Sequence, residues 1–421
     1  MSDPGRRNGI RGESADYDAV IVGASLAGCA TAILLGRAGA RVALVEKRPD
    51  PAAFKRICSH LIQSSAVPTL ERLDLLEPIL AAGGVRSRNR AWTKWGWIDP
   101  PSERTVPGVS LRRELLDPLI REAAGATPGV ELMLGRDACR LIREGDYFSG
   151  VVVRDREGNE TALRATLVVG ADGRDSGIAD LSGVAAKTLP HGRFVYAAYF
   201  EDALPECAPD SSIWLLDPQF VAAFPTDAGL TMYAAMLTKD RLPEFRSDPM
   251  AALVDFVASV PDAPPIRSGR PVGPVLGKLE MPNRVCRPVG PGLALVGDAA
   301  LTADPLFGIG CGWALQSGEW LADCVVPSLQ GQEPLTAGLR RYRRRHRREL
   351  RGHAYFINDY SSGRRMQPPE RFGFAAAARN PELGVVVDAY ASRRIKPTEM
   401  FARMVPRAVA YETQRALGLR G

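Results

Sequence analysis

A glycine-containing motif near the start of this 421-residue chain has the residue types and spacing to hold a phosphate group. The motif is Gly23-Ala24-Ser25-Leu26-Ala27-Gly28, between the apolar segment 17–22 and an Ala/Leu-rich segment that runs to Gly39. Glycines here allow a tight turn and bring backbone N–H groups close to a pyrophosphate at a helix N-terminus. Glu46 ends the next apolar segment, where an acid can bind a ribose hydroxyl. The spacing predicts a strand-helix-strand unit that binds a dinucleotide.

The motif departs from the usual pattern at its middle position. Ser25 stands where a glycine normally lets the phosphate approach the backbone. The prediction therefore depends on the whole set of strand, helix, second strand and terminal acid, and not on the glycines alone.

Two more acid-containing motifs follow apolar segments further along the chain. Segment 167–169 precedes Gly-Ala-Asp-Gly-Arg-Asp-Ser at 170–176, and segment 293–296 precedes Gly297-Asp298. The second is followed by Asp-Pro-Leu-Phe-Gly-Ile-Gly-Cys-Gly at 304–312. In this order, the three motifs resemble those of the class A flavin monooxygenases (aromatic hydroxylases), which are related to flavin-dependent halogenases and geranylgeranyl reductases. The resemblance spans roughly residues 17 to 350 and implies non-covalently bound FAD.

The resemblance also implies which residues hold the cofactor. Glu46 is expected at the adenosine ribose with Arg48 beside it, Arg112 at the diphosphate or ribityl chain, and Asp298 at a ribityl hydroxyl. The loop 308–312 is expected to open a helix whose positive end stabilises the reduced, anionic flavin. The full expected set is Gly23, Ala24, Ser25, Ala27, Gly28, Glu46, Lys47, Arg48, Arg56, Arg112, Asp172, Gly297, Asp298, Pro305, Gly308, Gly310 and Cys311.

His60 is the candidate catalytic residue, since it lies where relatives bring the chain past the flavin edge. A neutral imidazole there can take a proton from a phenol, and the alternative is a structural hydrogen bond. Cys311 is either redox-active or, more simply, a small buried residue.

The expected substrate is a planar aromatic or polycyclic molecule, because aromatic side chains fall on predicted strands of a second sheet. Core packing is the alternative for each of these side chains. The candidates are Trp95, Trp97, Trp214, Phe224 and Tyr233.

The reductant is expected to be NAD(P)H, bound only transiently. The Asp-Gly motif of the family usually ends in an arginine, but Ala179 stands at that place, and the chain has no second complete dinucleotide fingerprint. NAD(P)H is therefore expected either to bind only transiently or not to bind at all.

The resemblance favours a monooxygenase that hydroxylates an aromatic or polycyclic small molecule with NAD(P)H and O₂, in secondary metabolism. A halogenase needs a lysine beside a Trp-containing barrier; Lys94 and its neighbouring tryptophans have these residue types but lie before Arg112, away from the expected strand. A prenyl-chain reductase and a non-redox, FAD-containing cyclase are further alternatives.

The expected fold class is α/β, with a Rossmann-like FAD-binding domain, an interleaved antiparallel substrate sheet and a helical C-terminal region. The FAD-binding segments are 17–85, 105–182 and 284–330, and the substrate sheet comprises 86–104 and 183–283. Residues 1–16 are expected to be a disordered tail, and 331–421 to be helical.

Composition excludes several classes of function. The seven cysteines are widely spaced without a C-x-x-C pair, so neither a metal site nor a disulfide framework is expected, and a cytoplasmic location is the default. The net charge of +6 includes an arginine-rich run at 340–351, interpreted as the solvated face of a helix and not as a nucleic-acid site. No apolar run is long enough to span a membrane. The sequence leaves open whether the protein forms a homodimer.

Overall fold

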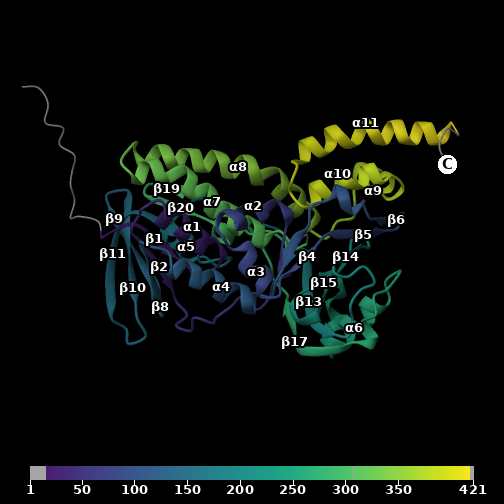
Figure 1. Ribbon diagram of the computed structural model, residues 1–421, viewed down its shortest axis with the longest axis horizontal. Coiled ribbons are helices and arrows are strands. Elements are labelled where there is room, and N and C mark those ends of the chain that lie inside the picture. The colour runs from purple at the N-terminus through teal and green to yellow at the C-terminus, as the bar shows by residue number, and fades with distance from the viewer. Residues whose placement is uncertain (1–15, 307, 418–421) are drawn as a thin grey trace, which may run out of the picture.

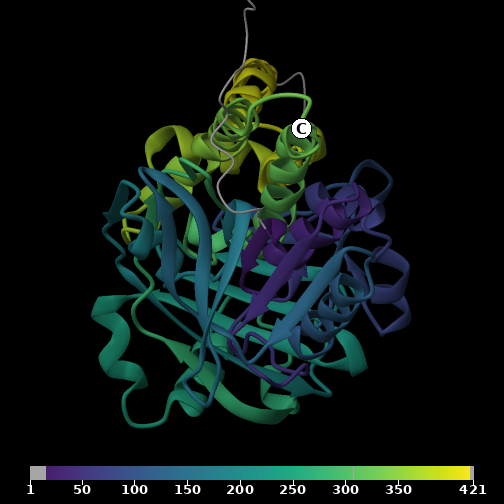
Figure 2. The same cartoon turned by 90° about the vertical axis from the view of Figure 1, so that its left-hand side faces the viewer.

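The computed structural model describes residues 16–306 and 308–417 of the chain. The expected N-terminal tail therefore lies almost wholly outside the described residues, as does Phe307 in the third motif. Within the described part, two sheets lie side by side and a group of C-terminal helices runs along one side of both (Figures 1 and 2).

The first sheet has a parallel core built on the N-terminal strand. Its strand order is β19-β20-β11-β1-β2-β8, with β10 and β9 added as an antiparallel extension of β11. The inner strands are buried on both faces, which explains their continuous apolar sequences. The strands are β1 (Tyr17–Val22), β2 (Val42–Glu46), β8 (Val130–Leu134), β9 (Asp137–Glu144), β10 (Tyr147–Arg154), β11 (Glu160–Gly170), β19 (Val289–Gly290) and β20 (Leu293–Leu295).

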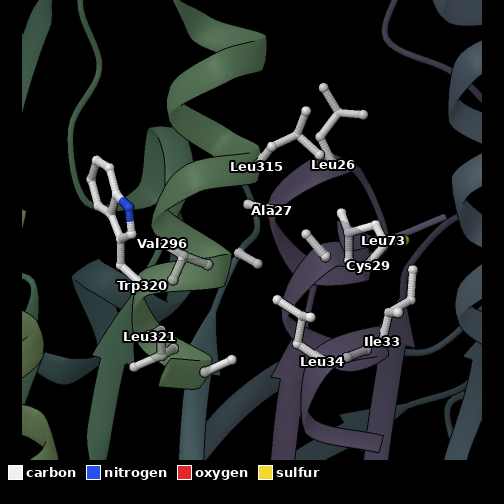
Figure 3. Close-up of a cluster of buried hydrophobic side chains, with 14 of the residues drawn as sticks. Leu26, Ala27, Cys29, Ile33, Leu34, Leu73, Val296, Leu315, Trp320 and Leu321 are labelled. Carbon is white, nitrogen blue, oxygen red and sulfur yellow. The ribbon is translucent and has the colours of Figure 1, made fainter. Parts of the chain in front are cut away.

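Helices cover this parallel sheet. Helix α1 is apolar all round, because it is enclosed by the sheet and by neighbouring helices. Figure 3 shows its Leu26 beside Leu315 of α7. The helices of this part are α1 (Leu26–Arg37), α2 (Val67–Arg72), α3 (Leu76–Ala81), α4 (Arg113–Gly125), α5 (Gly177–Ser182) and α7 (Gly310–Leu329).

The second sheet has seven strands in the order β17-β13-β16-β15-β14-β5-β6. All its pairings are antiparallel except that of β14 with β5, and helix α6 (Pro249–Ala258) packs on one face. The strands are β5 (Asn89–Thr93), β6 (Gly96–Ile98), β13 (Arg193–Glu201), β14 (Ser211–Leu215), β15 (Phe220–Pro225), β16 (Thr231–Thr238) and β17 (Arg270–Lys278).

Short strands connect the two sheets. Strand β7 pairs with both β3 and β4, and β12 pairs with β18. Their bounds are β3 (Leu61–Ile62), β4 (Val85–Ser87), β7 (Gly108–Ser110), β12 (Ala186–Leu189) and β18 (Asn283–Cys286).

The C-terminal region is helical. Its helices are α8 (Leu335–Tyr360), α9 (Pro368–Arg379), α10 (Pro381–Ala391) and α11 (Pro397–Ala416). The arginine-rich run lies in α8, where Tyr342, His346 and Leu350 face the core and six of the arginines are exposed. The run therefore lies on a helix and exposes most of its arginines, as the sequence predicts. None of the described helices is both long and apolar enough to cross a membrane.

The predicted α/β fold class is confirmed. Strands β15 and β16 form a hairpin whose turn, at residues 227–229, has Ala228 and Gly229 both at positive φ.

Candidate functional site

The turn between β1 and α1 is closed by glycines that no other residue can replace without movement. Gly23 has φ +107°, and a Cβ there would lie 2.4 Å from the Ala171 carbonyl oxygen. A Cβ on Gly28 would lie 1.9 Å from the Gly23 carbonyl oxygen. The backbone therefore passes the end of β11 closely. The first N–H groups of α1, such as that of Ala27, have no preceding helical turn to which they can bond.

Ser25, the departure from the usual motif, has a defined partner. The Arg113 guanidinium donates a 2.8 Å hydrogen bond from Nη2 to Ser25 Oγ, and its Nε donates to Asp117 Oδ1 at 2.8 Å. A buried cation thus lies beside the turn at which a phosphate is expected.

Glu46 lies at the carboxyl end of β2 and is 5% exposed. Its Oε2 accepts from the Ala24 N–H at 3.0 Å, and its Oε1 accepts from Arg48 N and Nε at 3.1 and 3.2 Å. The carboxylate and Arg48 are therefore fixed at the edge where a ribose is expected, while Lys47 is exposed.

Asp298 follows β20 at the same edge of the sheet. Lys55 Nζ lies 3.2 Å from Asp298 Oδ2. Burial would raise the pKa of Asp298, but Lys55, with smaller contributions from Arg174 and Arg113, holds that pKa below its usual value. Asp298 is therefore ionised at neutral pH. The neighbouring Gly297 donates its N–H to Ser317 Oγ of α7 at 2.8 Å, which ties the motif to that helix.

Two thiols meet at the start of α7. Cys58 Sγ and Cys311 Sγ are 3.4 Å apart, and Arg113 Nη1 lies 3.7 and 3.8 Å from them. The hydrogen bond with Cys311 lowers the pKa of Cys58 well below its usual value against the opposing effect of burial, and Arg113 contributes to the lowering. The same bond raises the pKa of Cys311. Of the two thiols, Cys58 is therefore the more acidic.

Arg112, expected at the diphosphate, points elsewhere. Its Nε and its backbone N–H donate to the two oxygens of the buried Asp227 carboxylate at 2.7 and 2.9 Å, so it ties α4 to the hairpin between β15 and β16. The cations that contact the β1–α1 turn are Arg113 and Arg121, whose Nε donates to the Ala24 carbonyl oxygen at 3.1 Å. Residues 113, 116, 117, 120, 121 and 124 form the buried face of α4, so helical periodicity is the signal that distinguishes Arg113 from Arg112.

For Asp172 and Arg56, the expected cofactor contacts stay predictions. The Asp172 carboxylate accepts from Ser176 Oγ at 2.5 Å and from the Ile178 N–H at 3.0 Å, and so it caps α5. Arg56 is exposed.

The Asp304-Pro305 loop is anchored by a residue that sequence reasoning missed. His191 Nε2 lies 2.6 Å from Asp304 Oδ2, and Asp304 Oδ1 accepts from the Leu306 N–H at 2.8 Å. Both side chains are buried. This pair holds Pro305 and leads the chain into Gly308, which has φ +63°.

His60 is buried, and both of its ring nitrogens are engaged. The Arg113 backbone N–H donates to Nδ1 at 3.0 Å, so the proton of the neutral ring lies on Nε2, which is hydrogen-bonded to the Tyr199 hydroxyl. Burial lowers the pKa of His60, and burial likewise raises the pKa of Tyr199. His60 is therefore a hydrogen-bond donor to Tyr199 and not a free base, and the Tyr199 proton is directed away from the histidine.

The structure divides the five expected substrate aromatics between the two faces of the seven-stranded sheet. Phe224 and Trp95 pack on the face that carries Tyr199 and Leu61. Trp97, Trp214 and Tyr233 belong to the opposite face, under α6. The five candidates, for each of which core packing was the alternative, therefore do not share one face, because alternate residues of a strand point to opposite faces. Lys94 is exposed in the β5–β6 turn, with its Nζ 4.8 Å from the Trp95 ring centroid.

Taken together, these residues fit an FAD. The glycine turn, the ribose-binding acid and the second acid after β20 converge at the carboxyl ends of parallel strands, the usual place for a dinucleotide. A Cβ at Gly310, the first residue of α7, meets no described atom within 4 Å, so that helix end has room beside it. Within the described residues, no group of three or more His, Cys, Asp or Glu side chains is placed to hold a metal ion.

Comparison with known proteins gives one family and several relatives. A family model described as "FAD binding domain" matches residues 16–351. The digeranylgeranylglycerophospholipid reductase of Methanosarcina mazei is 26% identical over 350 residues, which cover 80% of this chain and 82% of that protein.

Two solved structures show the same fold. The flavin-dependent brominase Bmp2 has a TM-score of 0.79 at 19% identity, covering 94% of this chain and 99% of its own. PqsL, a probable FAD-dependent monooxygenase from Pseudomonas aeruginosa, has a TM-score of 0.65 at 19% identity, covering 88% of this chain and 99% of its own.

Proposed function

Because the chain belongs to the FAD binding domain family, whose members are oxidoreductases, we propose that it is an FAD-dependent monooxygenase acting on an apolar small molecule that carries a ring oxygen. NAD(P)H supplies two electrons, one atom of O₂ enters the substrate as a hydroxyl group, and the other leaves as water. When bound, FAD supplies the electrons that activate O₂.

The cofactor-holding residues of this proposal are those at the edge of the parallel sheet. Glu46 binds the ribose, the α1 N-terminus and Arg113 bind the diphosphate, and Asp298 accepts a hydroxyl of the ribityl chain. The N-terminus of α7 at Gly310 provides positive potential beside the flavin ring.

The observation that carries the proposal is the Tyr199 hydroxyl. Tyr199 lies on the same sheet face as Phe224, its oxygen is bonded to His60 Nε2, and burial keeps it protonated. A donor held in this way among apolar side chains gains most from a substrate oxygen that accepts its hydrogen bond. A phenol or ring ketone supplies that oxygen, whereas a plain hydrocarbon does not.

In this account His60 is a positioning residue. Its Nδ1 is occupied by the Arg113 N–H, so it does not remove a proton from the substrate at neutral pH. It holds the Tyr199 oxygen, and Tyr199 fixes the substrate oxygen. The aliphatic and aromatic side chains around Tyr199 keep water away from the ring.

A second candidate is the reduction of a carbon–carbon double bond. The similarity to the Methanosarcina mazei reductase and the apolar surroundings of Tyr199 favour it. Here a hydride adds to one carbon, and Tyr199 supplies the proton to the other. This reaction consumes no O₂, and its product gains two hydrogens and no oxygen.

The test compares Tyr199→Phe with wild type on a panel of hydroxylated naphthalenes and anthracenes with NADH or NADPH. For a monooxygenase, the variant oxidises NAD(P)H but loses most of its hydroxylated product, because the substrate oxygen is no longer held. Tyr233→Phe is the matched control, since its hydroxyl bonds the Ala203 carbonyl on the other face. Unchanged product formation by Tyr199→Phe contradicts the proposed role.

A further inference from the structure

Helix α8 carries a row of exposed arginines on its outer face. Their spacing of three or four residues places them along one side of the helix, opposite the face that packs into the core. The arginine row consists of Arg340, Arg343, Arg344, Arg347, Arg348 and Arg351. At the usual rise per residue of an α-helix, the row is about 16 Å long.

Most of these arginines have no acidic partner. The half-buried Arg341 and Arg345 of the same helix each form an ion pair with a carboxylate, and Arg348 pairs with the glutamate that follows it. In the part of the chain that the structure describes, no carboxylate lies at ion-pair distance from the other five members of the row. Like charges at this spacing repel one another, so an anionic partner would stabilise the helix as it stands.

Helix α11 begins beside the last turns of α8. Lys396, just before α11, forms an ion pair with Glu349 of α8 at 3.3 Å, and the ring centroids of Phe356 and Phe401 are 5.8 Å apart. Both helices run along the same side of the molecule, away from the two sheets (Figures 1 and 2). Their exposed faces together are called the α8–α11 surface below.

The part of this surface that α11 contributes is apolar. Val405 and Val409, one helical turn apart, are 49% and 52% exposed, while Met404 and Ala408 face inward. Tyr355, which follows the arginine row on α8, is 65% exposed. Exposed aliphatic and aromatic side chains beside unpaired arginines are typical of a helix that lies in the interface of an anionic bilayer. A nucleic acid would match the arginines but not the valines.

We propose that the α8–α11 surface docks the protein on an anionic lipid bilayer. The arginine row lies on the lipid headgroups, and Val405 and Val409 enter the boundary between headgroups and acyl chains. Each arginine near such a membrane raises the affinity about five-fold, and a few aliphatic side chains add to it. Docking of this kind is peripheral and reversible, and it requires no membrane-spanning helix.

A cavity of about 390 Å³ opens beside this surface. Val405 and Phe372 line the cavity and are also exposed. Other parts of its wall, such as Ile213 and Leu215, belong to the same cluster of side chains as Tyr199. Docking brings this opening to the medium in which an apolar substrate dissolves. The use of the opening by a substrate rests on the proposed function, whereas the docking itself does not.

Co-sedimentation of the FAD-loaded protein with lipid vesicles tests the proposal in the absence of any substrate. The vesicles consist of phosphatidylcholine alone, or of phosphatidylcholine with roughly a third of phosphatidylglycerol. Wild type is expected to bind the anionic vesicles at low salt, to bind them more weakly as the salt concentration rises, and to bind the neutral vesicles least.

Removing three charges from the arginine row measures its contribution. The combined variant Arg343→Gln, Arg347→Gln and Arg351→Gln is expected to bind anionic vesicles about 100-fold more weakly and with less dependence on salt. Its melting temperature should match that of wild type, because these side chains are exposed and unpaired.

A second triple variant loses the same charge elsewhere on the surface. It replaces exposed arginines of β4, of the turn after β10 and of the segment before α6, and should bind anionic vesicles like wild type; the changes are Arg86→Gln, Arg156→Gln and Arg246→Gln.

The valines are tested separately from the charges. Val405→Ser combined with Val409→Ser is expected to weaken binding about 10-fold and to leave its salt dependence unchanged, because apolar burial is not screened by salt.

Three outcomes overturn the proposal. The first is no binding of wild type to anionic vesicles, and the second is equal affinity of the two arginine variants. The third is binding of a short DNA duplex at the same salt concentration without binding of vesicles, which would assign the arginine row to a nucleic acid.

Discussion

Replacing Gly310 with alanine separates the binding of FAD from the folding of the protein. Gly310 begins α7, its φ lies outside the left-handed region, and an added Cβ meets no described protein atom within 4 Å. Alanine in a helix is favoured over glycine by about 0.5–1 kcal/mol, so the free energy of unfolding without FAD should stay constant or rise by up to that amount.

The effect on FAD is expected to be opposite in sign. If the flavin ring lies against the N-terminus of α7, the new methyl group displaces it and weakens one hydrogen bond from the helix N–H groups. Loss of one such bond costs about 0.5–1.5 kcal/mol, which is a rise in Kd of roughly 2- to 10-fold. Titration of FAD-free protein by flavin fluorescence measures Kd, and urea unfolding measures stability.

Gly28→Ala is the matched comparison for Gly310→Ala. Its Cβ would lie 1.9 Å from the Gly23 carbonyl oxygen, so the β1–α1 turn must shift, and both the free energy of unfolding and the FAD affinity should fall. Equal Kd values for wild type and Gly310→Ala would refute the placement of the flavin at α7.

Three further changes probe the site. Asp298→Asn should weaken FAD binding and make the free energy of unfolding less dependent on pH in acid. Because Lys55 lowers the pKa of Asp298, the charged carboxylate stabilises the fold at neutral pH, and this stabilisation is lost as the pH falls below about 4. Iodoacetamide should alkylate Cys58 at neutral pH faster than an ordinary thiol. Cys311→Ser should change that rate, because it replaces the thiol that lowers the pKa of Cys58. Mass spectrometry of the peptides measures the extent of alkylation. Tyr199→Phe should lower the free energy of unfolding, measured by urea unfolding, by about 1–3 kcal/mol. The reason is that the buried Nε2–H of His60 loses the hydroxyl oxygen that accepts its hydrogen bond.

Each of these changes has a control or a contradicting outcome. Parallel acid-unfolding curves for wild type and Asp298→Asn would exclude the Lys55 interaction as a source of stability. Cys324, whose pKa is raised by burial, should stay unmodified under the same iodoacetamide treatment. An unfolding free energy of Tyr199→Phe equal to that of wild type would show that His60 donates elsewhere.

The motifs could be predicted from sequence because they depend on the backbone. Gly23 and Gly28 are required because backbone atoms come too close for a Cβ at either position. The place of Glu46 could be predicted because it ends the second strand of the strand-helix-strand unit. The α/β fold class follows in the same way from apolar segments that alternate with helical ones.

Side-chain roles depend on long-range contacts that a single sequence does not reveal. Arg112 and Arg113 are adjacent, and only the buried face of α4 shows which of them lies beside Ser25. His60 was expected either as a base or in a structural hydrogen bond, and its Nδ1 accepts from the N–H of Arg113, 53 residues away.

For the aromatic residues of the second sheet, the sequence likewise does not reveal which face each side chain points to. The alternation along β13 to β16 is regular, but which set of alternate residues faces α6 is decided by packing. Trp214 and Phe224 therefore looked equivalent in sequence and lie on opposite faces. Tyr199, on the same strand face as Ala197 and Val195, was overlooked because nothing local marks it.

Turnover with isotope-labelled O₂ and mass spectrometry of the product tests the proposed monooxygenase most directly. The purified protein is loaded with FAD and given NADH or NADPH and a hydroxylated polycyclic substrate. The account predicts a product that contains one labelled oxygen atom, formed only when O₂ is present. A product that gains two hydrogens and no label, and forms equally well without O₂, would contradict it and favour the reductase.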